Sequence, residues 1–124
     1  GKTPLTPHGF KNATLDPAII REWWSRTPQA NVAISCGPSH LVVVDLDVKN
    51  GIDGMMAWHV LCEEQDAPLP VTRRVRTPSG GQHLYFTGNA PSAVGFRPGI
   101  DIRGDGSYVL APPSQLAMGG YHVG

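Results

Sequence analysis

The chain has 124 residues, of which 40% are hydrophobic and 16% charged, and these values fit one compact domain with a small core. No apolar run reaches the roughly 18 residues of a membrane span, and no signal peptide is visible. The formal net charge is zero, which counts against a strongly basic nucleic-acid binder. We expect a cytoplasmic domain over residues 1–124, with no membrane partner, cut from a longer protein and lacking flanking elements.

The cysteine pattern bears on metal binding and compartment. Cys36 and Cys62 lie far apart, outside any Cys-x-x-Cys pair, and no His/Cys cluster has zinc-finger spacing. The sequence therefore predicts no zinc site, and a reduced intracellular compartment is the simpler interpretation.

Residues 1–15 are expected to be irregular, and two helices are predicted after them by their starts. Asp16 before Pro17 is typical of an N-cap followed by the first helical position, and this helix is expected to end near Arg26. Asp53 can cap a second helix that runs to about Gln65. The expected apolar sides are Ile19, Ile20, Trp23 and Trp24 in the first helix, and Met56, Val60 and Cys62 in the second.

Runs of β-branched and aromatic residues predict the strands. In chain order they are 31–35, 41–48, 71–76, 82–87, 99–103 and 107–111. The segment from Thr77 to Gly81 is expected to join two of them as a hairpin, whereas the tail after residue 111 matches no single element. Helices mixed with strands and hairpins predict an α+β fold.

An acidic pair ends the most apolar strand. Side chains alternate along a strand, so Asp45 and Asp47 are expected on one face, with Val44, Leu46 and Val48 on the other. Two parallel carboxylates repel each other, and cations such as Mg²⁺ or Mn²⁺ relieve that repulsion. Two such ions can clamp both oxygens of a phosphoryl displacement. A strand end with two solvated acids is the alternative for this pair alone.

The same alternation applies to two later strands. His83 and Tyr85 share one face, and so do Asp101 and Arg103, while apolar residues oppose them. If the three strands pair in one sheet, charged and imidazole side chains converge on one polar face. Bound cations would also reverse the local sign of charge there.

The loop before His83 suits phosphate binding. Ser79, Gly80 and Gly81 lack bulk, so backbone N–H groups can turn toward one point, and such nests bind phosphate. Thr77 and Ser79 add hydroxyl donors, and His83 can donate to a phosphate oxygen. An ordinary hairpin turn is the alternative that needs no ligand.

Three ordered motifs resemble those of the bifunctional primase-polymerase domain of phage and plasmid replication proteins, in the archaeo-eukaryotic primase superfamily. The stretch 43–47 is similar to that family's acidic pair, 77–86 to its Ser-Gly-Gly-x-His motif, and 99–104 to its third acidic motif. The segment before Lys2, where family members carry a strand and a helix, is missing from this sequence. The resemblance covers nearly the whole chain.

The resemblance implies a fold, an activity and residue roles. The fold would be an RRM-like antiparallel or mixed catalytic sheet with a small additional α/β unit. Asp45, Asp47 and Asp101 would hold two Mg²⁺ or Mn²⁺ ions. The implied nucleotide contacts are His83, Thr77, Ser79, Gly80, Gly81 and Arg103, with Lys2 and Asn31 as weaker candidates. The implied partners are nucleoside triphosphates, a DNA template and primer, and a helicase region of the full-length protein.

The predicted reaction is in-line attack of a primer hydroxyl on the α-phosphate of a nucleoside triphosphate, in phage or plasmid DNA replication. Two alternatives remain. A rolling-circle-type replication nuclease would need a His-hydrophobic-His pair and a tyrosine nucleophile, whereas the chain has His83-Leu84-Tyr85. A non-catalytic RRM-like nucleic-acid-binding module would present stacking aromatics on the sheet face, where only Tyr85 is expected.

Overall fold

A computed structural model describes residues 4–124 and has the predicted α+β architecture. The helices are the 3-10 helix η1 (Gly9–Asn12), α1 (Pro17–Arg26) and α2 (Gly54–Glu64). The strands are β1 (Val32–Ser35), β2 (Leu41–Leu46), β3 (Val48–Lys49), β4 (Ile52–Asp53), β5 (Arg74–Arg76), β6 (Gln82–Thr87), β7 (Ala93–Arg97), β8 (Ile100–Arg103), β9 (Tyr108–Ala111), β10 (Gln115–Leu116), β11 (Gly119–Gly120) and β12 (His122–Val123).

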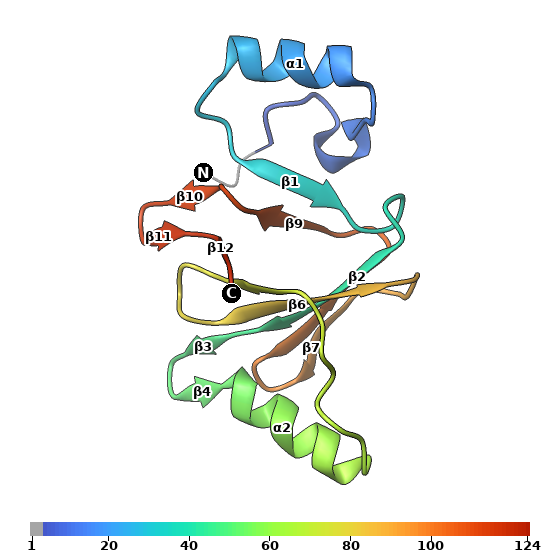
Figure 1. The fold of residues 1–124 in the computed structure, drawn as a ribbon, viewed down its shortest axis with the longest axis vertical. Coiled ribbons are helices and arrows are strands. Elements are labelled where there is room, and N and C mark those ends of the chain that lie inside the picture. The colour runs from blue at the N-terminus through green and yellow to red at the C-terminus, as the bar shows by residue number, and fades with distance from the viewer. Residues whose placement is uncertain (1–3) are drawn as a thin grey trace.

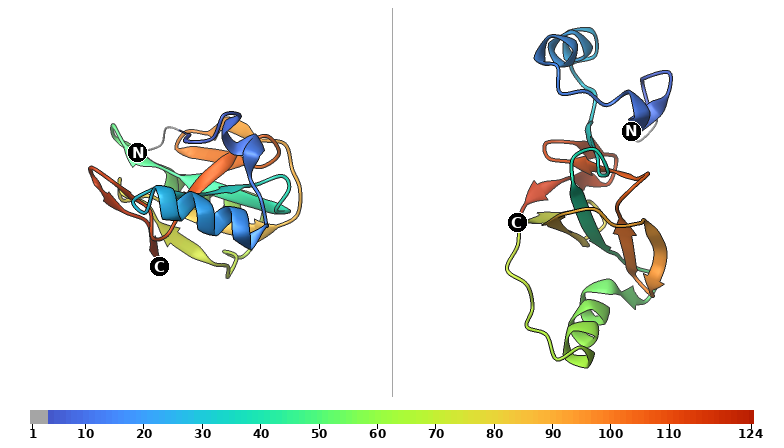
Figure 2. Two further views of the ribbon diagram at one scale, coloured as in Figure 1. Left: turned by 90° about the horizontal axis from the view of Figure 1, so that it is seen from above. Right: turned by 90° about the vertical axis from the view of Figure 1, so that its right-hand side faces the viewer.

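Six strands form one antiparallel sheet, and the remaining strands pair in small two-stranded sheets. The six-stranded order is β12-β5-β6-β2-β8-β7, and the small pairs are β1-β9, β10-β11 and β3-β4. Helix α2 lies on one side of the six-stranded sheet, while the β1-β9 pair and then α1 lie on the other, in both side views (Figures 1 and 2). The molecule is therefore layered, with the large sheet between α2 and the small sheet.

The register of β2 decides what each face of the large sheet carries. Asp45 lies opposite His83 on β6 and opposite Asp101 on β8. The neighbouring residues Val44, Leu46, Leu84 and Ile100 form a buried core on the other face, and Met55, Ala57 and Trp58 of α2 pack against that core. The polar side chains thus face the β1-β9 pair. Buried clusters around Val43 and Leu110 fill the space beside them.

The predicted strand 41–48 is wrong at its end. Strand β2 stops at Leu46, and the backbone of Asp47 bonds elsewhere: its N–H donates to the Gly99 carbonyl (2.8 Å), and its carbonyl accepts from the Gly54 N–H (2.7 Å). These bonds turn the chain away from the sheet. Val48 is consequently 36% exposed and pairs with Asp53, instead of joining the apolar face.

The predicted inward sides of both helices need correction. Met56 and Val60 are 62% and 44% exposed, and Cys62 is the one predicted inward residue of α2 that is buried. Met55 and Trp58 precede Cys62 by seven and four residues, so these three lie on one helical stripe. Met55 and Trp58 of this stripe pack against the core of the large sheet. Helix α1 has no buried residue, because it covers only the edge of the small sheet.

Several short elements differ from the predicted ones. The expected strand 71–76 is reduced to β5, and the segment expected to be irregular contains η1. Strand β7 was missing from the prediction because Gly95 sits at its centre and its pairing with β8 is interrupted by a register shift. The tail forms β10, β11 and β12, each of two residues, which is too short for a periodic pattern. Both cysteines are buried and free. No helix within residues 4–124 is long and apolar enough to cross a bilayer.

Candidate functional site

Three aspartates gather on the polar face of the large sheet. Asp45 comes from β2, one residue before its end, Asp101 from β8 directly opposite, and Asp47 from the turn that follows β2. One carboxylate oxygen from each lies within 4.8 Å of the others. Hard oxygen donors in such a set suit a cation of the Mg²⁺ or Mn²⁺ class. The residues present therefore fit the divalent metal that the motifs predict.

The electrostatics of Asp47 reflect this crowding. Partial burial, together with the negative charges of Asp45 and Asp101, raises the pKa of the Asp47 carboxyl above its ordinary value, although Lys49 and Arg103 pull it down. Like charges held this close destabilise the ionised cluster unless a cation neutralises them.

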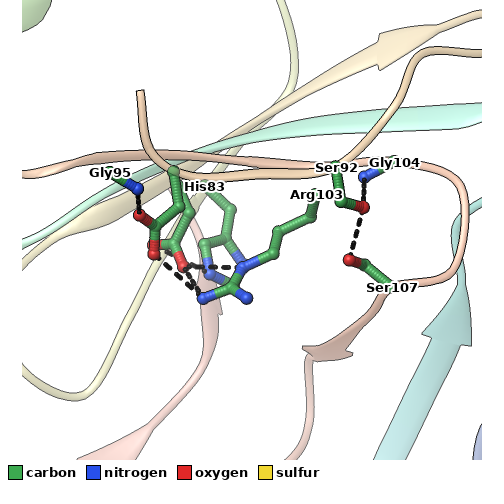
Figure 3. A network of polar contacts seen from close by, with 8 residues as sticks. His83, Ser92, Gly95, Arg103, Gly104 and Ser107 are labelled. Atoms are coloured by element: carbon green, nitrogen blue, oxygen red, sulfur yellow. Dashed lines mark hydrogen bonds and ion pairs between the residues drawn. The ribbon is translucent and has the colours of Figure 1, made fainter. Parts of the chain in front are cut away.

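Arg103 supplies positive charge to two of the three carboxylates. Its Nη2 lies 3.3 Å from Asp45 Oδ2 and 3.1 Å from Asp101 Oδ2, and its Nε lies 3.4 Å from the same Asp45 oxygen (Figure 3). Arg103 follows Asp101 by two positions on β8, so strand alternation puts both side chains on one face.

His83 contacts the other oxygen of Asp45. Its Nε2 lies 3.5 Å from Asp45 Oδ1, and the residue is only 6% exposed. Burial alone would raise the pKa of Asp45, but the hydrogen bond and charge of His83, together with Arg103, outweigh it and hold that pKa below its ordinary value. The Nδ1 of His83 is buried and has no partner among residues 4–124.

Backbone and hydroxyl groups hold the rest of the site in place. The Gly95 N–H donates to Asp101 Oδ1 at 2.7 Å, so β7 orients that carboxylate (Figure 3). Beyond Arg103, the Ser92 hydroxyl accepts from the Gly104 N–H (2.9 Å) and lies 2.5 Å from the Ser107 hydroxyl. These bonds attach the loop between β8 and β9 to Ser92, the residue directly before β7.

A cavity of about 350 Å³ opens beside Asp45 and Arg103, on the side of β9. Its lining residues are Asp45, Arg103, Gly106, Ser107, Tyr108, Val109, Leu110 and Tyr121. Sites for small ligands begin at roughly this size. Sequence reasoning missed Ser107 and Tyr121. Ser107 follows Arg103 by only four residues, and this closeness in sequence could have suggested that it lies near the site. Tyr121 lies in the tail, where the sequence showed no pattern.

The predicted phosphate-binding turn lies at the end of β2. A side chain at Gly81 would meet the Leu46 carbonyl oxygen at 2.1 Å, so the turn packs one residue before Asp47. The N–H groups of Thr77 and Gly80 donate within the turn, at 3.1 Å each, to the carbonyls of Gly81 and Thr77. Ser79 and Gly80 are exposed. The turn is thus adjacent to the acidic cluster without lining the cavity described above.

Two weaker candidates are not brought to this site. Asn31 exchanges hydrogen bonds with the backbone of Gln115 (2.9 and 2.8 Å) and lines a separate cavity of about 560 Å³ beside α1. Its contacts indicate a structural role, and its contact with nucleotide stays a prediction. Lys2 lies outside the described residues.

A family model described as "Bifunctional DNA primase/polymerase, N-terminal" matches residues 1–124. Neither the comparison with curated proteins nor that with solved structures gives a significant match.

Proposed function

Because the chain belongs to the family of bifunctional DNA primase/polymerase N-terminal domains, we propose that it extends a primer on a DNA template by nucleotidyl transfer at the acidic cluster. The family membership confirms the resemblance found in the three motifs and implies a primase/polymerase enzyme that acts on nucleotides and DNA. The observation that carries the proposal is the set of three carboxylates whose oxygens lie within 4.8 Å of one another.

The proposed reaction is in-line attack of a 3′-hydroxyl oxygen on the α-phosphorus of a nucleoside triphosphate. A new phosphorus–oxygen ester bond forms, the bond to the bridging oxygen of pyrophosphate breaks, and the hydroxyl proton leaves to solvent. Asp45, Asp47 and Asp101 would hold two divalent cations, Mg²⁺ or Mn²⁺, which when bound lower the pKa of the hydroxyl and neutralise the leaving group. The protein itself mainly positions the reactants.

We assign the triphosphate to groups around this cluster. Arg103 carries positive charge beside the cavity and can donate to phosphate oxygens. We keep His83 as a candidate phosphate contact, although its Nε2 faces Asp45 and its Nδ1 is buried. The hydroxyls of Thr77 and Ser79, with the Gly80–Gly81 backbone, extend the contact surface along the turn. Lys2 and Asn31 stay secondary candidates. We also infer that a helicase region elsewhere in the full-length protein supplies the template during phage or plasmid replication.

Primer extension tests the metal ligands. The Asp45→Asn and Asp101→Asn variants are each expected to lose at least about 100-fold in extension rate with Mg²⁺ or Mn²⁺, because a missing carboxylate removes charge where the reaction needs it. Asp66→Asn is a matched control, since Asp66 is exposed and its φ of 51° suits asparagine. Near-normal extension by the folded Asp45→Asn variant would contradict the assignment.

A further inference from the structure

Both oxygens of Asp45 and of Asp101 already have partners. Asp45 Oδ1 faces His83, and Asp101 Oδ1 accepts from the Gly95 N–H. The Oδ2 atoms of both residues contact the guanidinium of Arg103, at 3.3 and 3.1 Å. A cation that takes one oxygen from each aspartate must therefore displace or share an existing partner.

Arg103 is the partner best able to leave. The ring of His83 is buried, and the Gly95 N–H belongs to the backbone of β7, so neither can move without disturbing the sheet. The Arg103 side chain is 32% exposed and hangs on a long flexible stem. A guanidinium and a divalent cation repel each other when they share the same carboxylates, and this repulsion acts on the group that is free to rotate.

The displaced guanidinium has a place to go. Arg103 lines the cavity of about 350 Å³ that adjoins Asp45, together with the hydroxyl-bearing residues Ser107, Tyr108 and Tyr121. A guanidinium released from the carboxylates there is an unpaired cation facing a small polar cavity. Its planar fork of donors matches the oxygens of a phosphate group.

We propose that Arg103 substitutes for the metal ion in the metal-free protein, and that cation binding releases Arg103 to bind a phosphate group in the adjacent cavity. The identity of the anion rests on the proposed function. Two consequences follow from linkage. Removing the guanidinium raises the affinity for the cation, and in the intact protein the cation and the anion each raise the affinity for the other by the same factor.

The first test measures Mn²⁺ binding without nucleotide, by titration calorimetry. The Arg103→Met variant, which keeps an apolar stem but loses the charge, is expected to bind Mn²⁺ roughly 5- to 50-fold more tightly than the parent chain. The matched control is Arg97→Met. Arg97 lies on the neighbouring strand β7. Its guanidinium carbon stands 4.9 Å from the centre of the Phe96 ring, and its Nη1 donates to the Phe96 carbonyl. The Arg97→Met variant is therefore expected to bind Mn²⁺ as the parent does.

The second test measures coupling with sulfate, which mimics phosphate and chelates Mn²⁺ only weakly. Saturating sulfate, compared with chloride at equal ionic strength, is expected to tighten Mn²⁺ binding by about 5-fold or more in the parent chain. The Arg103→Met variant is expected to show no such gain.

The outcomes separate this inference from the proposed function. If Arg103→Met binds Mn²⁺ no more tightly than the parent, while Asp45→Asn loses binding, Arg103 does not substitute for the metal and only this inference fails. If Asp45→Asn retains Mn²⁺ binding, the carboxylates are not the metal site and both proposals fail. Circular dichroism checks folding, and Arg103→Gln provides a second neutral variant that must show the same gain.

Discussion

The charge of Asp45 is set by the side chains that it contacts on the two neighbouring strands. Asp45 is 8% exposed, and burial alone would favour its neutral form. His83 and Arg103 reverse that preference, one from each neighbouring strand, so the pKa of Asp45 is lowered and the carboxylate stays charged at neutral pH. His83 and Arg103 thus favour the charged form of Asp45 before any metal is present, and the charged carboxylate is the form that would bind a hard cation.

Tyr85 carries a polar atom that the fold does not satisfy. Its hydroxyl is buried without a partner among residues 4–124, and burial, with a contribution from Cys36 and against one from Arg73, raises the pKa of Tyr85 above 10. We expect Tyr85→Phe to increase the free energy of unfolding by up to about 1 kcal/mol at pH 7, because an unsatisfied group is removed.

The same substitution changes the pH dependence. Since the pKa of Tyr85 is raised in the folded chain, ionisation of this phenol favours the unfolded chain. The resulting loss of stability is absent below pH 10 and grows as the pH rises toward the folded pKa. Urea unfolding at pH 7 and pH 10.5 should therefore show a smaller alkaline loss for Tyr85→Phe than for the parent chain. If Tyr85→Phe is less stable than the parent at pH 7, the hydroxyl makes a stabilising hydrogen bond and the prediction is wrong.

Elements position the site through close backbone contacts. The turn between β5 and β6 approaches the end of β2 so closely that only glycine fits at position 81, whereas a Cβ at Gly80 would meet no atom within 4 Å. Gly80 has a φ of 91°, in the region that favours glycine. Adjacent glycines thus serve different needs, one steric and one conformational.

Alanine at each of these positions should separate the two needs. Gly80→Ala is expected to cost about 1–2 kcal/mol through backbone strain alone. Gly81→Ala is expected to cost more, on the order of 4 kcal/mol, because its Cβ would force β6 away from the Leu46 carbonyl. Urea denaturation measures both. Equal losses would show that the turn relaxes away from β2.

Helix α2 shows how an element can be found while its orientation is not. Its cap at Asp53 was predicted and is present, since that side chain accepts from the N–H groups of Met55 and Met56. Apolar residues occur on nearly every side of the helix, so the spacing of apolar residues does not decide which side faces the core. One stripe runs through Met56 and Val60, and another through Met55 and Trp58. Contact with Ile100 and Leu84 selected the stripe that contains Trp58 and left Val60 exposed.

The whole molecule carries the electrostatic cost of its acidic cluster. Partial burial, together with repulsion from Asp45 and Asp101, raises the pKa of Asp47, so the ionised side chain opposes folding at neutral pH. The Asp47→Asn variant should therefore melt about 2–5 °C higher than the parent in the presence of a chelator.

The same variant should respond less to metal. Mn²⁺ that binds only the folded parent stabilises it by about 2.7 kcal/mol at 100 times its dissociation constant, and thermal melts report this as a rise in Tm. Asp47→Asn should lose most of that rise. If Asp47→Asn melts at a lower temperature than the parent in the presence of a chelator, the charge of Asp47 does not oppose folding. If Mn²⁺ raises the Tm of this variant as much as that of the parent, Asp47 is not a metal ligand.

The sequence by itself determined what depends on neighbouring residues. Helix caps, the hairpin turn and the alternation that puts Asp101 with Arg103 and apart from Ile100 follow from local backbone geometry, which a few residues encode. Tertiary structure alone decided the strand order, the cavity under β9, the turn that removes Asp47 from β2, and the contact between Arg103 and Asp45, residues 58 positions apart. Those features are fixed by competition between distant segments for the same buried space and the same charges, and no local pattern records which segment wins.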